Sequence, residues 1–228
     1  MASSGSRRRG GELARQPLLV GVLASGEGTN LQALLDRVHG SGGIRIAAVA
    51  SDRPAAPALA RARAAGIPTA VFEPRAYPDR AARDEAIADW LERHGVRLVV
   101  LAGYMRLLHE RFLERFPQAV INVHPALLPS FPGLHAVRQA LDYGVKVFGV
   151  TVHFVDRGID SGPVILQRAL ELPDAREEGE VLAALHELEH ELLPEAVRLF
   201  AAGALRLDPA NPRRVLIERR SALECGRR

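Results

Sequence analysis

Residues 18–35, which read LLVGVLASGEGTNLQALL, decide the fold. The apolar run 18–23 predicts a buried strand, and the leucines after the glycines recur at helical spacing. A strand, a glycine loop and a helix in this order present backbone N–H groups and the positive end of a helix dipole to an anion. A phosphate would therefore fit at this loop, which contains Gly28, Thr29 and Asn30. The alternative is a tight turn that needs glycine only for its backbone.

The rest of the chain repeats this alternation of strand and helix. Apolar runs at 18–24, 44–50, 69–72, 97–101 and 119–123 alternate with helical patterns near 30–38, 55–65, 79–94 and 109–115. This order predicts an α/β fold with a Rossmann-like, mostly parallel sheet and helices on both faces. Beyond a helix near 134–142, alternating strands at 146–155 and 163–170 predict an antiparallel addition, and a long helix at 178–202 then covers one face.

Charge is unevenly distributed along the 228 residues. Residues 1–17 and 208–228 each carry a net charge of +3, which leaves −3 on residues 18–207. We expect a disordered basic N-terminal extension over 1–17, one catalytic domain over 18–207 and a basic C-terminal tail over 208–228. Because the basic charge belongs to the ends, the sequence predicts no nucleic-acid partner for the folded body.

The chain has no run approaching the roughly 20 apolar residues of a membrane span, and its basic start is followed by glycines rather than by an apolar segment. We expect no membrane association. The single cysteine excludes an intrachain disulfide framework and a cysteine metal cluster. These features predict a cytoplasmic protein.

Residues 119–129, which read AVINVHPALLP, end a predicted strand with two polar side chains. Side chains two apart on a strand point to the same side, so Asn122 and His124 project together. An amide can hold an oxyanion, and an imidazole can move a proton. The alternative is a short buried strand before a proline-rich turn, with the histidine bonded to backbone.

Two further loops follow predicted strands. Residues 101–108, LAGYMRLL, mix a glycine, an aromatic ring and a cation, and predict the lining of a flat pocket; the alternative is strand–helix packing with Arg106 solvated. Residues 156–163 form a turn rich in aspartate and glycine. Such turns are usually only turns, but Asp160 beside a histidine would orient the imidazole and raise its pKa.

The last long helix carries Glu189 inside its apolar stripe, where a carboxylate needs a polar partner or a cleft. The same helix reads HELEH at 186–190, which matches the H-E-x-x-H zinc pattern through His186 and His190. Zinc needs a third ligand, and no histidine follows this pair. A zinc metalloprotease is therefore a remote alternative, and we expect no metal.

In this order the motifs resemble those of the folate-dependent phosphoribosylglycinamide formyltransferases of purine biosynthesis, from about 18 to 207. The matching segments are GEGTNL at 26–31, GYMR at 103–106, N-x-H-P-x-L-L-P at 122–129, FPG at 131–133, D-x-G-P at 160–163, and EH at 189–190 with Pro194. The resemblance implies transfer of a formyl group from 10-formyltetrahydrofolate, as co-substrate, to the amine of glycinamide ribonucleotide.

The resemblance also implies roles for individual residues. Asn122, His124 and Asp160 would be catalytic, with protonated His124 kept charged by Asp160. The remaining residues would bind substrates: Gly28, Thr29 and Asn30 the phosphate, Glu189 the ribose hydroxyls, Met105, Arg106, Leu107, Leu108, Val155 and Asp156 the pterin, and Arg80 the benzoylglutamate part.

Related folate enzymes share the Asn-x-His and Asp features, so other acceptors stay open. A formyltetrahydrofolate hydrolase would carry a domain ahead of residue 18, and a methionyl-tRNA formyltransferase would carry one after residue 207. A non-catalytic folate-binding module would not need Asn122, His124 and Asp160 together. We expect two small-molecule substrates as partners, no nucleic acid, no membrane, and a monomer or homodimer.

Overall fold

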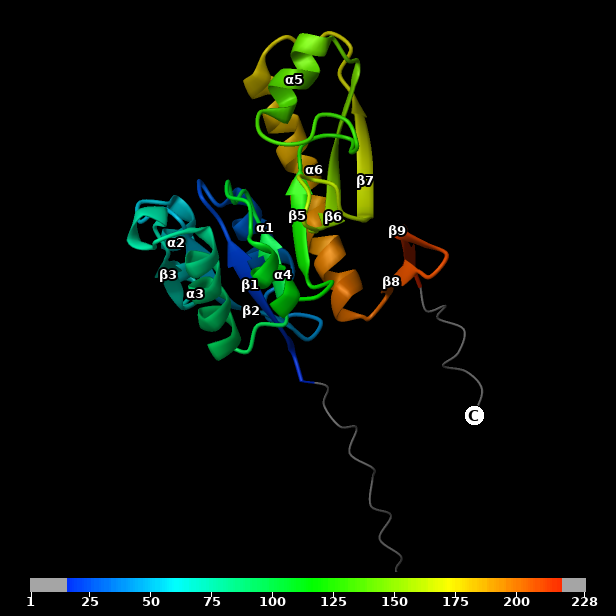
Figure 1. Cartoon of the computed structure of the whole chain (residues 1–228). Helices are drawn as coiled ribbons and strands as arrows, with labels where there is room; N and C mark the ends of the chain where they lie inside the picture. Colours follow the sequence, from blue (N-terminus) through cyan, green and yellow to red (C-terminus); the bar gives the residue numbers. More distant parts are fainter. Residues whose placement is uncertain (1–15, 219–228) are drawn as a thin grey trace, which may run out of the picture.

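Figure 1 shows the computed structural model, which describes residues 16–218. In this range nine strands follow the order β3-β2-β1-β4-β5-β6-β7-β9-β8. The strands are β1 (Leu18–Leu23), β2 (Ile44–Ser51), β3 (Thr69–Val71), β4 (Leu98–Leu101), β5 (Val120–His124), β6 (Val147–Phe154), β7 (Val164–Glu171), β8 (Leu205–Asp208) and β9 (Asn211–Ile217). The helices are α1 (Thr29–Arg37), α2 (Pro57–Ala64), the short 3₁₀ helix η1 (Pro74–Ala76), α3 (Arg80–Arg93), α4 (Glu110–Arg115), α5 (Ala136–Tyr143) and α6 (Glu178–Ala201).

Strands β1 to β5 form a parallel sheet between two apolar layers. Leu31 and Leu34 of α1 and Leu185 and Leu192 of α6 pack against one face, together with α2, while α5 packs against α6. Helices α3 and α4 cover the other face. Strands buried on both faces read as continuous apolar runs, which explains the sequence pattern. The predicted Rossmann-like α/β architecture is confirmed.

Local signals fix where two of these helices begin and end. Asp79 precedes α3 and its side chain accepts a hydrogen bond from Ala82 N at 2.8 Å, which satisfies one free N–H group of the first turn. Helix α5 ends at Gly144, whose φ of 83° lies in the left-handed region that glycine adopts without strain.

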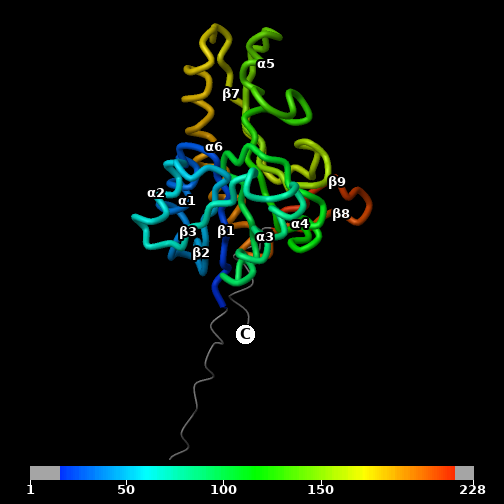
Figure 2. Tube along the Cα trace, turned by 60° about the vertical axis from the view of Figure 1, so that its left-hand side comes forward, coloured from blue at the N-terminus to red at the C-terminus, as the bar shows by residue number. Residues whose placement is uncertain are grey.

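Strand β5 is where the sheet changes direction. It pairs in parallel with β4 on one side and antiparallel with β6 on the other, and β6 pairs antiparallel with β7. The predicted antiparallel addition is confirmed. Figures 1 and 2 show the far ends of β6 and β7, with α5 and the first turns of α6, projecting beyond the parallel part of the sheet.

Strand pairing continues past the expected C-terminal boundary at residue 207. Residues 211–217, assigned to a tail, form β9, which pairs antiparallel with β8 and meets β7 through Val164 and Arg214. This strand contains an apolar run, Val215, Leu216 and Ile217, which stands beside basic residues in a stretch whose net charge is typical of a tail. Residues 1–15 and 219–228, which hold most of the expected extension and the remainder of the tail, lie outside the described residues. Within 16–218, no helix has the length and apolar character to cross a membrane.

Candidate active site

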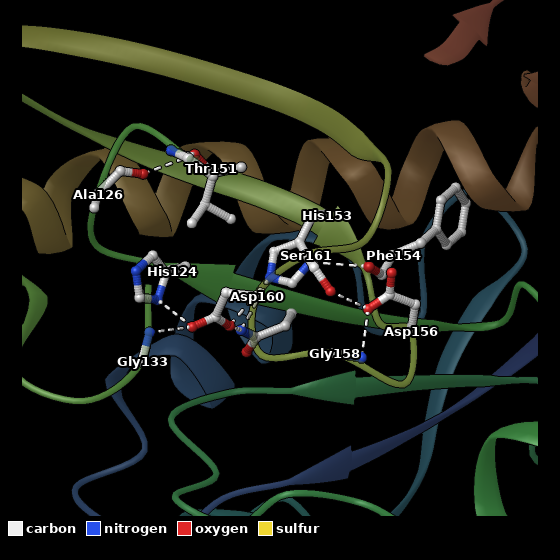
Figure 3. A network of polar contacts seen from close by, with 12 residues as sticks. His124, Ala126, Gly133, Thr151, His153, Phe154, Asp156, Gly158, Asp160 and Ser161 are labelled. Atoms are coloured by element: carbon white, nitrogen blue, oxygen red, sulfur yellow. Dashed lines mark hydrogen bonds and ion pairs between the residues drawn. The ribbon is translucent and has the colours of Figure 1, made fainter. Parts of the chain in front are cut away.

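The predicted catalytic residues lie together at the carboxyl end of β5. Asn122 and His124 are two apart on this strand and share a side of it, and Asp160 reaches them from the turn between β6 and β7. Asp160 Oδ1 lies 3.3 Å from Asn122 Nδ2, and Asp160 Oδ2 lies 3.4 Å from His124 Nδ1. Figure 3 shows His124 and Asp160 facing each other. The carboxyl edge of an open sheet is where α/β proteins place their ligands.

Asp160 has a backbone conformation that few residues tolerate. Its φ is +47°, in the left-handed region, which costs a residue with a side chain about 1 kcal/mol. The carboxylate is held in place because Gly133 N donates a hydrogen bond to Oδ2 at 2.8 Å. Burial raises the pKa of Asp160, but contacts with His153, His124 and Gly133 N lower it by more. The side chain is therefore a carboxylate at neutral pH.

Both nitrogens of the buried His124 ring face acceptor oxygens. Nε2 lies 2.8 Å from the carbonyl oxygen of Phe131, and Nδ1 faces Asp160. Burial nevertheless lowers the pKa of His124, and this effect outweighs the raising effects of Asp160 and of the Phe131 carbonyl. Burial thus opposes the expected effect of Asp160, whereas an acceptor oxygen at each nitrogen favours the charged ring, so the role of Asp160 in keeping His124 protonated stays a prediction. Asp160 acts in the expected direction, but the sequence did not reveal how deeply the ring is buried.

His153 is a member of this group that the sequence did not identify. The buried ring places Nδ1 2.9 Å from the Phe154 carbonyl oxygen and Nε2 3.3 Å from Asn122 Nδ2 and 3.5 Å from Asp160 Oδ1. His153 pairs with Asn122 across β5 and β6, so only the strand register would have revealed it.

The glycine loop places a free helix N-terminus beside this group of strands. Gly28 precedes α1 with φ 73°, and a Cβ there would lie 2.7 Å from the Cα of Ala58, so this position requires glycine. In the described structure no side chain caps the first turn of α1. Its N–H groups, beginning at the half-buried Thr29, can therefore bind an anion.

The buried carboxylate of Glu189 has the partner that its position demanded. Asn30 Nδ2 donates a hydrogen bond to Glu189 Oε2 at 2.7 Å, and both side chains are buried. Burial raises the pKa of Glu189, while Asn30 and the nearby His186 lower it by less. This contact joins α1 to α6, so the predicted phosphate and ribose residues lie in one place.

The loop after β4 exposes apolar side chains. Met105 is 52% and Leu107 51% exposed, and Ile159 beside Asp160 is 55% exposed. The expected pterin lining is therefore apolar and accessible, and its contact with a pterin stays a prediction. Leu108 is partly buried and packs on the core beneath α3 and α4. Arg106 is partly exposed, and its Nε donates to Asp52 Oδ2 at 2.8 Å.

Two of the other expected folate contacts, Val155 and Asp156, make hydrogen bonds within the fold. Val155 N donates to the Val120 carbonyl oxygen at 2.9 Å, which extends the β5–β6 ladder. Asp156 Oδ1 accepts from Gly158 N and from Ser161 Oγ, and so holds the turn that carries Asp160 (Figure 3). Arg80 is exposed at the start of α3. Contacts of these residues with folate remain predictions.

The two histidines of the H-E-x-x-H pattern stack on α6, with ring centroids 6.2 Å apart. Across residues 16–218, no three His, Cys, Asp or Glu side chains gather as metal ligands would. The absence of a metal stays a prediction for experiment. The intervening Glu187 lies on the opposite side of the helix from the buried Glu189, as the helical spacing predicts.

Comparisons with known proteins show which family the chain belongs to. A family model described as formyl transferase matches residues 19–197. The phosphoribosylglycinamide formyltransferase of Bacillus subtilis is 42% identical over 178 residues, which cover 78% of this chain and 91% of the relative. The crystal structure of glycinamide ribonucleotide transformylase 1 from Symbiobacterium toebii superposes with a TM-score of 0.86 at 48% identity, covering 90% of this chain and 96% of the other. The corresponding enzyme from Anaplasma phagocytophilum gives 0.82 at 36% identity, with 91% and 97% covered. The chain therefore belongs to the phosphoribosylglycinamide formyltransferase family.

Proposed function

We propose that this chain transfers the formyl group of 10-formyltetrahydrofolate to the amine of glycinamide ribonucleotide, a step of purine biosynthesis in the cytoplasm. One observation supports this proposal above the others. The same edge of the sheet holds the group of Asn122, His124 and Asp160 and, beside it, a glycine loop whose N–H groups can bind an anion. Family membership supports the same reaction.

Glycinamide ribonucleotide has a phosphate at one end and an amine at the other, and the site offers matching groups in that order. The phosphate would lie on the N–H groups of α1 behind Gly28. The ribose hydroxyls would donate to Glu189, whose carboxylate is anchored by Asn30. This arrangement would direct the amine toward the end of β5.

In the proposed reaction the amine attacks the formyl carbon, and the carbonyl oxygen becomes an oxyanion. The Asn122 amide stabilises that charge by donating a hydrogen bond to the oxyanion. Its contacts with His153 and Asp160 are both long, at 3.3 Å, and are therefore easily replaced by this hydrogen bond. Neutral His124 takes the proton that the amine loses and delivers it to N10 of the folate as the carbon–nitrogen bond breaks. Asp160 stabilises the imidazolium that exists between these two transfers.

The acceptor is tested directly. Purified protein is incubated with 10-formyltetrahydrofolate and, separately, glycinamide ribonucleotide, water alone or methionyl-tRNA, and tetrahydrofolate release is measured. We expect release only with glycinamide ribonucleotide, accompanied by its formylated product. Equal release without any acceptor would make the chain a hydrolase, and formylation of the tRNA would make it the tRNA enzyme.

A further inference from the structure

Three strand ends are tied together beneath the loop of residues 103–108. Ser25, which follows β1, donates its N–H to the Gly103 carbonyl oxygen at 3.0 Å, and its Oγ accepts from Met105 N at 3.0 Å. The start of the glycine loop and the start of the 103–108 loop therefore share a buried serine. Movement of either loop would break these bonds.

Asp52, directly after β2, adds a charge to this junction. Its side chain is fully buried, whereas the Arg106 side chain that pairs with it at 2.8 Å is 45% exposed. Burial raises the pKa of Asp52, but Ser25 and Arg106 lower it by more, so the carboxylate is ionised at neutral pH. Its other oxygen, Oδ1, is buried with no hydrogen-bond partner in the part of the chain that the structure describes. The ion pair with Arg106 thus offsets much of the free-energy cost of burying the Asp52 charge.

We propose that Asp52 is a positioning residue. Its ion pair fixes the Arg106 side chain and thereby the conformation of the 103–108 loop, which forms one wall of the folate pocket. The inference rests on the proposed function and assigns a residue that the sequence motifs did not include. It also changes the role of Arg106. With Nε paired to Asp52, Arg106 fixes the backbone that presents Met105 and Leu107, instead of contacting the pterin with its own side chain.

A double-mutant cycle separates these two roles. Asp52→Asn, Arg106→Gln and the double variant are titrated with tetrahydrofolate by calorimetry, and the KM for 10-formyltetrahydrofolate and kcat are measured alongside. We expect each single variant to raise Kd and KM about fivefold or more with little change in kcat. The Kd of the double variant should lie within about twofold of the Kd of the single variant that binds less tightly. Arg106→Lys, which keeps the charge, should retain part of the affinity.

The matched control is Asp142→Asn, which removes the same charge from the exposed pair between Asp142 and Arg138 on α5. It should leave Kd and KM unchanged. If Arg106→Gln weakens binding and Asp52→Asn does not, or if their effects add, Arg106 is a direct ligand and the proposal is overturned. A parent chain that neither binds tetrahydrofolate nor transfers formyl groups would instead overturn the proposed function.

Discussion

Replacing Asp160 by Asn tests the proton-transfer scheme most directly. The change keeps the size of the side chain, and asparagine tolerates the left-handed φ of +47° better than most residues, so the turn should survive. What is lost is the negative charge 3.4 Å from His124 Nδ1. The contact from Gly133 N can still be made to the amide oxygen.

The size of the effect follows from that distance. At 3.4 Å, two unit charges attract by about 1 kcal/mol in bulk water and by about 5 kcal/mol at an effective dielectric constant of about 20. Because the Asp160 side chain is 16% exposed, we expect a value of about 1.5–3 kcal/mol, which is roughly one to two pKa units for His124. If that charge stabilises the imidazolium during transfer, kcat falls by about 10- to 100-fold.

Two measurements check this reasoning. Removing the carboxylate lowers the pKa of His124 further, so neutral His124 persists to lower pH and the low-pH limb of the kcat profile should move down by about one unit or more. NMR titration of the imidazole gives the same pKa without turnover. Asp156→Asn, which loosens the same turn from a position without contact to His124, should change KM but leave the pKa of His124 in place. A parental rate and pH profile for Asp160→Asn would refute the scheme and reduce Asp160 to a turn residue.

Three further predictions address the remaining parts of the site. Asn122→Ala and His124→Ala should each lower kcat by about 10² or more with a modest change in KM, because both act on charge that develops in the transition state; near-normal turnover by either variant would exclude that role. Dialysis against EDTA should leave formyl transfer intact, whereas loss of activity that zinc restores would assign a metal to His186 and His190. Glu189→Gln should raise the KM for glycinamide ribonucleotide about fivefold, since a neutral acceptor binds hydroxyls less strongly. Since the folded-state pKa of Glu189 is raised, its stabilising contribution is present at acidic pH and lost as pH rises through that pKa. The same variant should therefore be more stable than the parent at pH 7, by about 1 kcal/mol in urea unfolding, and a clear loss of stability would contradict this.

Much of the site could be predicted because it depends on local periodicity. Asn122 and His124 share a side of β5 since strands repeat every two residues, and helical spacing places Glu189 among leucines. The place of Gly28 between a strand and a helix predicts its role in the loop. Each of these inferences uses only neighbours in the sequence.

The features of the site that could not be predicted from the sequence depend on strand register and on burial. His153 faces Asn122 because of how β6 aligns with β5, and Asp52 meets Arg106 across a separation of 54 residues. The lowered pKa of His124 follows from the depth of the ring, which no motif records. Strand β9 contains two arginines, Arg213 and Arg214, and this basic charge is typical of a tail, so the apolar run after them predicts no strand.

The hydrogen bond between Asn30 and Glu189 closes a loop of 159 residues. During synthesis the chain emerges from its N-terminus, so the phosphate loop is made early but its partner on α6 appears only near the end. A contact of such long range forms late in folding, since the entropy of closing the loop must be lost first. Glycinamide ribonucleotide would thus bind only a nearly complete chain, and its binding would protect both ends of the fold against unfolding together.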